Sequence, residues 1–423
     1  MPADRISAAE LSSTVPWPAL GSEEYSWAPR APEIHSNAEV RRQTGQYFAA
    51  VPPKIAELDV SLSAVEARDL EESTAALVAF DNHAQKTLGL DSPALGPMSA
   101  ILLRTESASS SQIEQLTTSA KQLALAEIEE IGARGSRTNA RTVIGNVRAM
   151  EAALALSEQV SAEAILAMHQ ELLRHQFGFE DEAGRFRREQ VWIGGDHAGP
   201  IGADFVAPHH DRVPAAIDDL ISFIDRVDIP VLAQVAISHA QFETIHPFVD
   251  GNGRTGRALA QSVIRNKRLV TSTTVPISAG LLADTERYFD ALGAYRVGDA
   301  GPIVRAFTDA SRLAAFTGTQ LVNELAEQLE LAREKLRGVR ADAAAWKLLP
   351  TLIGQPVVNT RHLQRRLGMT EASALRALAT LVEREVLVER TGYGRNRVWQ
   401  HSGIIAVLDE YAAGIRRRAQ RRG

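Results

Sequence analysis

Residues 246–257 read His-Pro-Phe-Val-Asp-Gly-Asn-Gly-Arg-Thr-Gly-Arg, a stretch with a histidine, a carboxylate, three glycines and two arginines. This composition does not suit a packed core, because charged side chains are rarely buried unpaired and glycines are entropically costly in regular structure. Residues 258–264, Ala-Leu-Ala-Gln-Ser-Val-Ile, predict a helix. The glycines therefore lie at a helix N-terminus, where free N–H groups and the helix dipole favour a bound anion such as phosphate.

The charged residues of this stretch have the chemistry that a phosphate-binding site requires. Arg254 and Arg257 are three positions apart, so they share one helix face and can bind phosphate groups by forked hydrogen bonds. Asp250 offers an oxygen ligand for Mg²⁺ beside the anion. His246 can accept a proton near neutral pH.

Two simpler interpretations compete with this one. A histidine before a proline is more often structural than catalytic, and Pro247 should turn His246 away from helical geometry while Phe248 anchors the loop. The glycines also match the dinucleotide-binding pattern GxGxxG, but that pattern requires a preceding strand. Residues 231–245 read as a helix, so a dinucleotide fold is excluded.

The complete stretch resembles the signature of the Fic family, HPFx[D/E]GNGRxxR, at every defined position. The resemblance implies a mainly α fold, a Fic-type helical bundle with a small β-hairpin flap. It also implies transfer of AMP from ATP to a Ser, Thr or Tyr hydroxyl of a protein, with ATP as substrate and Mg²⁺ as cofactor. The implied roles are a base (His246), a Mg²⁺ ligand (Asp250), a cradle for the inner phosphates (Gly251, Asn252, Gly253) and ligands of the outer phosphates (Arg254, Arg257).

A serine run at 107–111 lies upstream of this stretch. We expect it to interrupt a helix, with a new helix starting near Gln112 and serines available as N-caps. Taken alone, Glu114 is then a solvated acid at the start of a helix.

One class of Fic protein carries an inhibitory helix with the pattern [S/T]xxxE[G/N], and Ser110 and Glu114 match it. The resemblance implies an inhibitory helix at about 107–120 in which Glu114 pairs with Arg257 and blocks a productive pose of ATP. A carboxylate and a terminal phosphate can compete for one guanidinium group. Gln115 stands where Gly or Asn is usual, which puts the local turn geometry in question.

Residues 191–207 predict a β-hairpin, because two short β-prone runs flank a glycine-rich tip. It is either a structural cover over the core or a flap to which an extended protein substrate adds as a strand. Family members have a flap with that role at this place. His197, His209 and His210 lie in or near it; they suggest a metal, but no regular spacing supports one, and surface loop histidines are the favoured interpretation.

Residues 355–400 predict two short helices, a strand, a turn and a second strand, the order of a winged helix-turn-helix. Gly354 to Gly423 contain 13 Arg, no Lys and 6 Asp or Glu, whereas the whole chain has a net charge of −6. This basic segment binds either DNA or another protein. The candidate DNA contacts are Thr370, Ser373, Arg376 and Arg395, and the tail (Arg416, Arg417, Arg418, Arg421, Arg422) is a weaker polyanion-binding candidate.

The 423 residues predict two or three domains, and the expected division is 1–135, 136–315, a linker helix at 316–342, and 343–423. Residues 1–35 should be extended and 38–49 helical. There is no cysteine, no signal peptide is recognised and no membrane span is expected, so we expect a cytoplasmic protein. A homodimer is left open.

Three functions are consistent with these features. The first is a protein adenylyltransferase that Glu114 inhibits. The second is removal of AMP by the same site, with Glu114 orienting a water molecule. The third is a DNA-binding regulator whose Fic core senses nucleotide.

Overall fold

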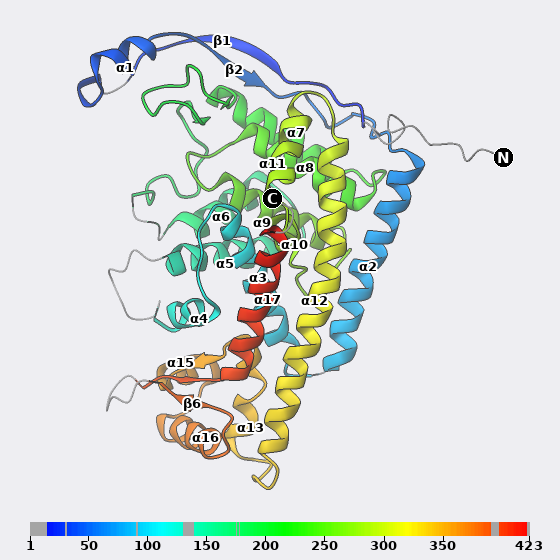
Figure 1. The fold of residues 1–423 in the computed structure, drawn as a ribbon, viewed down its shortest axis with the longest axis vertical. Helices are drawn as coiled ribbons and strands as arrows, with labels where there is room; N and C mark the ends of the chain where they lie inside the picture. The colour runs from blue at the N-terminus through cyan, green and yellow to red at the C-terminus, as the bar shows by residue number, and fades with distance from the viewer. Residues whose placement is uncertain are drawn as a thin grey trace, which may run out of the picture.

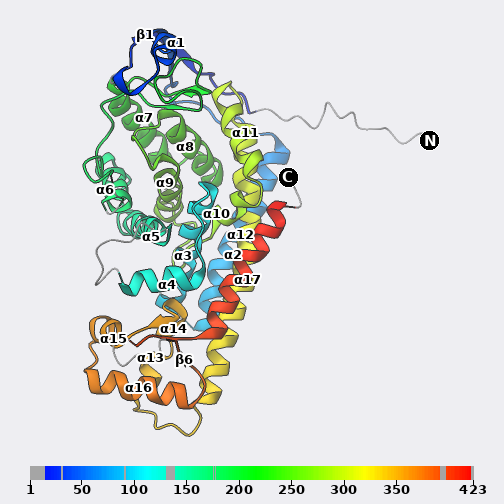
Figure 2. The same cartoon turned by 60° about the vertical axis from the view of Figure 1, so that its left-hand side comes forward.

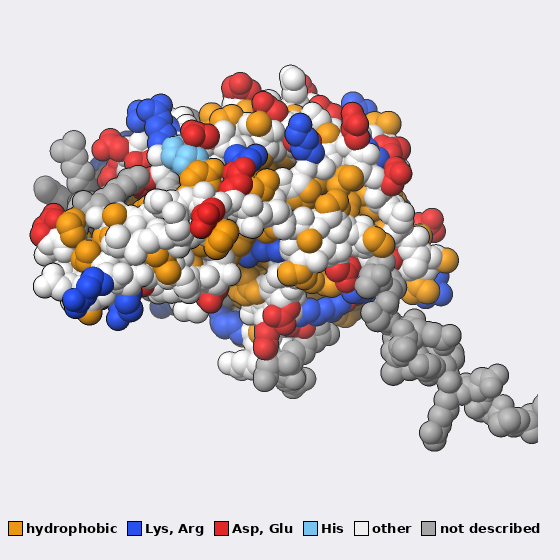
Figure 3. Space-filling model, turned by 90° about the horizontal axis from the view of Figure 1, so that it is seen from above, with side chains coloured by type: hydrophobic (Ala, Val, Ile, Leu, Met, Phe, Trp, Pro, Cys, Tyr) orange, Lys and Arg blue, Asp and Glu red, His pale blue; other side chains and the backbone are white. Residues whose placement is uncertain are grey.

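The computed structural model describes residues 15–29, 32–89, 92–129, 139–174, 176, 178–390 and 397–420. The described chain is mainly helical, as predicted. Its helices are arranged along one long axis, with the β1–β2 hairpin (residues 21–51) at one end and α15 and α16 (residues 360–383) at the other (Figure 1). The face at the hairpin end mixes acidic, basic and hydrophobic side chains (Figure 3).

The elements follow one another along the chain with these bounds. The helices are α1 Asn37–Arg42, α2 Ala64–Leu88, α3 Leu95–Ile113, α4 Ala120–Glu129, α5 Asn139–Ala155, α6 Ala162–Leu173, α7 Val213–Asp225, α8 Val231–Ile245, α9 Asn252–Asn266, α10 Ile277–Leu282, α11 Thr285–Arg296, α12 Gly301–Lys335, α13 Ala344–Leu348, α14 Thr351–Gly354, α15 Thr360–Leu367, α16 Glu371–Glu383 and α17 Ser402–Gln420. The strands are β1 Gly21–Trp27, β2 Gly45–Val51, β3 Trp192–Ile193, β4 Phe205–Val206, β5 Val357–Val358, β6 Val388–Glu389 and β7 Trp399–Gln400. They form the antiparallel pairs β1–β2 and β3–β4 and a three-stranded sheet in the order β5-β7-β6.

Helix α8 lies at the centre of the core. Every residue from Leu232 to Ile245 is buried, which is expected of a helix surrounded by others on all sides. Helices α7, α9, α11 and α12 pack around it. The 35-residue α12 runs along the molecule beside α2 and α17 (Figure 2). The central position of α8 fixes where its C-terminal residue, and the stretch after it, must lie.

The prediction for the N-terminal region was wrong in one place. Residues 38–49 are not one helix, since α1 ends at Arg42 and residues 45–51 form β2. Tyr47 and Ala49 are buried while Gln46 and Phe48 are exposed, and this alternation is typical of a strand with one covered face. Residues 21–27 are extended, as expected, and they pair with β2 as the strand β1.

The serine run does not interrupt a helix, contrary to the prediction, because α3 continues through it to Ile113. The hydroxyl of Ser107 donates to the carbonyl of Leu103, and that of Ser111 donates to the carbonyl of Ser107. These serines bond back onto their own helix and so cap nothing. The side chain of Asn146 on α5 donates to the carbonyl of Ser107 and fixes α3 from the side.

The C-terminal elements occur in the predicted order, with α15, α16, β6 and β7 following one another. Residues 391–396, including Arg395, and residues 421–423, including Arg421 and Arg422, lie outside the described residues. Helix α17 was not predicted; it returns along α12 and contacts α4 and α10. The winged-helix assignment remains a prediction, as does the domain division, although α12 runs unbroken across the expected boundary at 315. Among the described residues, no helix combines the length and apolar character that crossing a bilayer requires.

Two helical glycines provide a test of this packing. A Cβ on Gly280 in α10 would overlap the backbone of Ala310 in α12, whereas a Cβ on the exposed Gly293 in α11 meets nothing within 4 Å. Gly280→Ala should therefore destabilise the protein by about 1–3 kcal/mol through overpacking. Gly293→Ala should stabilise it by about 0.5–1 kcal/mol, because alanine loses less backbone entropy in a helix. Thermal unfolding of both variants checks this; equal shifts in Tm would contradict the packing of α10 on α12.

Candidate active site at the junction of α8 and α9

The turn between the two helices begins at His246, the C-cap of α8. Its backbone is left-handed, with φ 49° and ψ 59°, and its N–H donates to the carbonyl of Phe242. This is the departure from helical geometry that Pro247 predicts. The imidazole is partly exposed, and its Nδ1 lies 3.4 Å from the carbonyl oxygen of Glu243. Because a carbonyl can only accept, Nδ1 carries the proton and Nε2 is left as the basic atom.

Burial, reinforced by the positive charges of Arg187 and Arg296, lowers the pKa of His246 to about 4. The imidazole is thus neutral at physiological pH. A neutral ring with a free Nε2 can accept a proton, which is the chemistry expected of a general base.

The loop after His246 is closed by its own side chains. The backbone N–H of Phe248 donates to Oδ1 of Asn252 at 2.9 Å, and Nδ2 of Asn252 donates back to the carbonyl of Phe248 at 2.9 Å. Phe248 is fully buried, as predicted, and its ring stacks on that of His169 at 3.6 Å. The Asn252 side chain is therefore committed to the loop, which leaves its backbone N–H, and not its amide, as the group that faces an anion.

Helix α9 starts at Asn252, and its N-cap Gly251 is left-handed, with φ 79°. A Cβ on Gly251 would come within 2.8 Å of Leu172, so glycine is needed for both its conformation and its size. No side chain among the described residues caps this helix. The first N–H groups of α9 thus form the anion-favouring helix mouth that the sequence predicts.

Glu114 occupies this mouth. Its Oε2 lies 2.7 Å from Nε of Arg254, and NH2 of Arg257 donates to its Oε1 at 2.7 Å. A Cβ on Gly253 would come within 2.6 Å of the same Oε1. The structure therefore brings together the predicted residues Glu114 and Arg257, and it adds Arg254 as a second partner that the sequence did not indicate.

Both arginine side chains are only 3% exposed, so each depends on its protein contacts. Arg257 also donates from Nε to the hydroxyl of Ser110 at 2.8 Å and from NH2 to its carbonyl at 2.9 Å. Although burial acts to lower it, the Glu114 carboxylate holds the pKa of Arg257 above its usual value. Ser110 and Glu114 thus bind one guanidinium group from the same end of α3.

Gln115, the residue that departs from the pattern, is left-handed with φ 62°. Non-glycine residues adopt this conformation at an energetic cost, which asparagine bears best. The usual Gly or Asn at this position is therefore explained by the turn. Gln115, in place of the usual Gly or Asn, adds strain to the turn but does not displace the Glu114 carboxylate.

Asp250 lies beside the mouth with its side chain 35% exposed. Its Oδ2 accepts a hydrogen bond from Gln176 at 2.7 Å and lies 3.4 Å from NH2 of Arg254. A partly exposed carboxylate next to an anion-binding helix mouth is the donor that Mg²⁺ prefers. The chemistry of Asp250 therefore fits the predicted ion.

Two residues that sequence reasoning missed hold the loop in place. Arg187, 2% exposed, donates from Nε to the carbonyl of His246 at 2.8 Å and from NH2 to the carbonyl of Pro208. His169 on α6 accepts from the N–H of Gly184 at its Nδ1 and bonds the carbonyl of Asp250 through Nε2 at 3.1 Å. Burial lowers the pKa of Arg187 to about 10 and that of His169 to about 4. No local pattern distinguishes them from the arginines and histidines of the surface.

The predicted hairpin is present as β3 and β4, paired through Trp192 with Val206 and Ile193 with Phe205. Its tip is bound to the N-terminal region. The indole N–H of Trp27 donates to the carbonyl of Ala198, and Gln43 exchanges two hydrogen bonds with the backbone of Ile201. The hairpin thus lies against β1–β2 and is not isolated among helices.

Residues 159–264, from just before α6 to α9, match the Fic/DOC family. The chain contains a Fic/DOC family domain. This domain includes the flap, Arg187 and the stretch 246–257, and the family resemblance of that stretch is thereby confirmed.

Curated relatives share the Fic domain. The chain is 30% identical over 149 residues to the protein adenylyltransferase Fic of Nematostella vectensis. The aligned residues make up 35% of this chain and 32% of the relative. It is 31% identical over 151 residues to the protein adenylyltransferase fic-1 of Caenorhabditis elegans, covering 35% of this chain and 26% of the relative. The chain thus covers about a third or less of the length of these relatives.

A solved structure shows the same fold over a longer span. The crystal structure of a Fic family protein from Desulfovibrio desulfuricans G20 matches 81% of this chain and 97% of its own length. The TM-score is 0.50 and the sequence identity is 23%, so the similarity concerns the fold.

His169, which supports the loop between α8 and α9 through the carbonyl of Asp250, should make the stability of the protein depend on pH. Its pKa is about 4 in the folded protein and about 6.5 when unfolded, so the unfolded state binds the proton more readily. Its contribution is therefore complete above pH 6.5 and is lost as the pH falls towards 4, by roughly 2 kcal/mol between pH 7 and pH 5. His169→Gln should lower Tm at pH 7 and reduce the further drop in Tm between pH 7 and pH 5.

The half-buried His83 on α2, which lies far from the loop in the sequence, provides the control, since His83→Gln should leave the drop in Tm with pH as it is in the unsubstituted protein. If His169→Gln also left it unchanged, His169 would not be the neutral support of the loop.

Proposed function

We propose that this protein transfers AMP from ATP to a Ser, Thr or Tyr hydroxyl of a protein, and that Glu114 keeps the site closed. The observation that carries the proposal is the pair of contacts from Glu114 to Arg254 and Arg257 at the mouth of α9, beside a neutral His246. The names of the curated relatives, protein adenylyltransferases, support the same activity.

In this proposal the phosphates of ATP lie against the first turn of α9. The backbone N–H groups at Gly251, Asn252 and Gly253 face the inner phosphates, and the Asn252–Phe248 hydrogen bonds keep that turn rigid. Arg254 and Arg257 bind the outer phosphates once Glu114 has left. Rigid placement of donors where negative charge accumulates is the main source of catalysis in such a site.

His246 acts on the substrate hydroxyl. The hydroxyl oxygen bonds to the α-phosphorus, the bond from that phosphorus to the bridging oxygen breaks, and pyrophosphate leaves. The hydroxyl proton passes to Nε2 of His246, the atom that the Nδ1 contact with the Glu243 carbonyl leaves unprotonated. Arg187 keeps the ring in place by binding the His246 carbonyl.

Asp250 is the residue that would hold Mg²⁺. When bound, the ion would neutralise charge on the phosphates. Gln176 orients the Asp250 carboxylate from the side.

The protein substrate is proposed to dock along the flap, residues 191–207. Its strands β3 and β4 precede the Arg187-bound Pro208, so the flap is fixed to the backbone that carries His246. Main-chain pairing with the flap would present one hydroxyl to the imidazole. We place this activity in the cytoplasm and leave a homodimer as an expectation.

Removal of AMP by the same site is a second candidate, favoured by one observation. Glu114 is 28% exposed and lies at the mouth of α9, where it could orient a water molecule towards an AMP-linked hydroxyl. Purified AMP-labelled target incubated with the protein separates the two activities.

DNA binding by the C-terminal segment is proposed as a separate function. Arg361, Arg365 and Arg366 on α15 and Arg376 on α16 are all exposed. Thr370 caps α16 by accepting from the N–H of Ser373, which makes it a structural residue and leaves the arginines as the phosphate contacts. A gel shift with and without residues 343–423, repeated at two salt concentrations, tests this function.

His246→Ala should reduce AMP transfer by about 10²–10⁴-fold, because it removes the general base. ATP binding should be retained, since the arginines and the mouth of α9 are unchanged. Labelling with radioactive ATP and equilibrium binding of ATP measure the two effects. A variant that still labels protein at the original rate would disprove the role of His246.

Substitutions at two neighbouring residues should have opposite effects. Glu114→Gly removes the carboxylate that binds both arginines, so auto-labelling with AMP should rise at least 10-fold. Gln115→Gly relieves the left-handed backbone at φ 62°, so it should stabilise the closed turn by about 0.5–1 kcal/mol and leave auto-labelling at or below its original level. Rates for both variants are measured under the same conditions; unchanged labelling in Glu114→Gly would contradict autoinhibition.

A further inference from the structure

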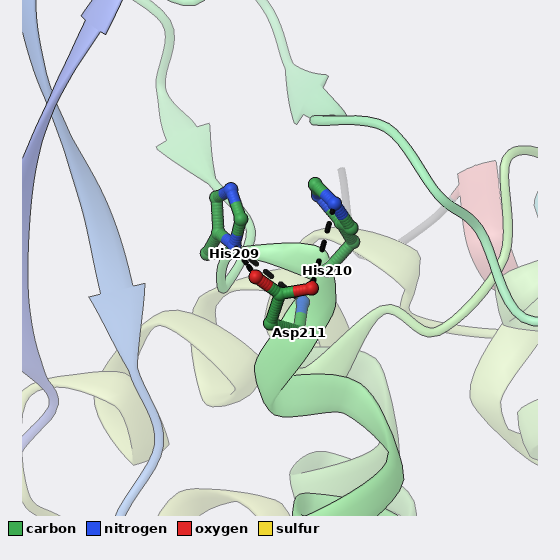
Figure 4. Close-up of side chains that lie close together, drawn as sticks. All are labelled: His209, His210 and Asp211. Carbon is green, nitrogen blue, oxygen red and sulfur yellow. Dashed lines mark hydrogen bonds and ion pairs between the residues drawn. The ribbon is translucent and has the colours of Figure 1, made fainter.

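Three consecutive residues after the flap, His209, His210 and Asp211, place their side chains together. They form the turn that leads from β4 into α7, and His210–Arg212 is a short 3-10 helix. Both imidazoles stand over the Asp211 carboxylate (Figure 4). One ligand atom from each residue lies within 4.8 Å of the other two. The favoured interpretation as unrelated surface histidines did not foresee this cluster, because sequence spacing does not reveal the turn.

The distances in the cluster match those between ligands of one metal ion. Nδ1 of His209 lies 3.3 Å from Oδ2 of Asp211, and Nε2 of His210 lies 3.6 Å from Oδ1. Two nitrogen or oxygen ligands of a tetrahedral zinc ion, each about 2.0–2.2 Å from it, are about 3.3–3.6 Å apart. Each imidazole thus lies at such a distance from one oxygen of the Asp211 carboxylate, and one ligand atom from each of the three residues lies within 4.8 Å of the other two.

Both rings are held by packing, whereas the carboxylate is not. The His209 ring stacks on Tyr25 of β1, with the ring centroids 4.5 Å apart and the planes at 11°, and it contacts the tilted His210 ring at 4.1 Å. The two histidine side chains are 21% and 30% exposed, against 80% for Asp211. An ion can therefore approach from the Asp211 side and find the two imidazoles preorganised.

The adjoining charged residue is already paired. Arg212 binds Glu23 of β1 through both its Nε and its NH2. This pair ties the turn to β1 and offsets the positive charge next to the cluster. The same contacts hold the turn in a fixed position relative to the β1–β2 pair.

We propose that His209, His210 and Asp211 bind one divalent transition-metal ion of the zinc class, separate from the Asp250 site. Two imidazoles and one carboxylate suit zinc, copper or nickel, whereas Mg²⁺ prefers oxygen ligands alone. The ion lies in the turn between the base of the flap and the start of α7, next to Tyr25 of β1. This proposed metal site does not depend on whether the protein transfers AMP.

The experiment uses the full chain without a polyhistidine tag, first cleared of metal with a chelator. The chain has no cysteine that would compete for the ion. Isothermal titration with Zn²⁺ should show one equivalent bound, and Co²⁺ should give the visible absorption of a four-coordinate site. His209→Ala, His210→Ala and Asp211→Asn should each weaken binding at least 10-fold.

Two histidines outside the cluster provide the control, since His83→Ala and His197→Ala should leave the affinity unchanged. Circular dichroism checks that each variant is folded; Asp211→Asn keeps the size of an 80% exposed side chain and carries the test if a histidine variant unfolds. Less than one equivalent bound by the unsubstituted protein, or equal affinity in the cluster variants and the controls, would overturn the site.

Discussion

The contacts between one carboxylate and two guanidinium groups at the mouth of α9 are the constraint on which the site depends. Arg254 and Arg257 are almost fully buried, and removing the partner of a buried charge is strongly destabilising. Glu114 must therefore stay at the mouth until another anion replaces it. The left-handed Gln115 is the visible consequence, because the chain accepts backbone strain there to end α3 with Glu114 in this position.

Helix α3, which carries Glu114, is held by regions far apart in the sequence. Its buried Glu106 accepts hydrogen bonds from Gln261 of α9 and from Ser278 of α10. Arg104 pairs with Glu127 of α4 and donates to the carbonyl of Gly354 in α14. The position of Glu114 is thus fixed jointly by the Fic domain and by the segment that follows α12, so changes in either can alter how Glu114 contacts the two arginines.

A buried polar group lies behind the arginines. Glu243, three residues before His246, approaches Gly256 so closely that a Cβ there would come within 2.9 Å of its Oε1. Burial raises the pKa of Glu243 to about 7, although the charge of Arg257 acts against this. The protonation state of Glu243 therefore depends on the charge of Arg257. Because Arg257 also binds Glu114, the buried carboxyl group of α8 is linked electrostatically to the mouth of α9.

How much the sequence predicts depends on whether a feature is local. The motif residues, the geometry of His246 and the burial of Phe248 follow from neighbours within a few positions, and the structure agrees. Arg187, His169 and the pairing of β1 with β2 arise from contacts between segments that are distant in sequence, and no local pattern indicates them. The serine run was misread because serine favours caps in isolation, whereas here its hydroxyls bond back to the carbonyls of their own helix. Helix α17 was not predicted, because the sequence analysis considered this segment only for its arginines and not for its contacts with α4, α10 and α12.

The most direct test of this account is a crystal structure of the Glu114→Gly variant with ATP and Mg²⁺. The account predicts that the phosphates lie against the first turn of α9, with Arg254 and Arg257 bound to them and with His246 facing the α-phosphate. Nucleotide bound elsewhere, with other side chains of the protein filling the space that Glu114 leaves beside Gly253, would contradict it.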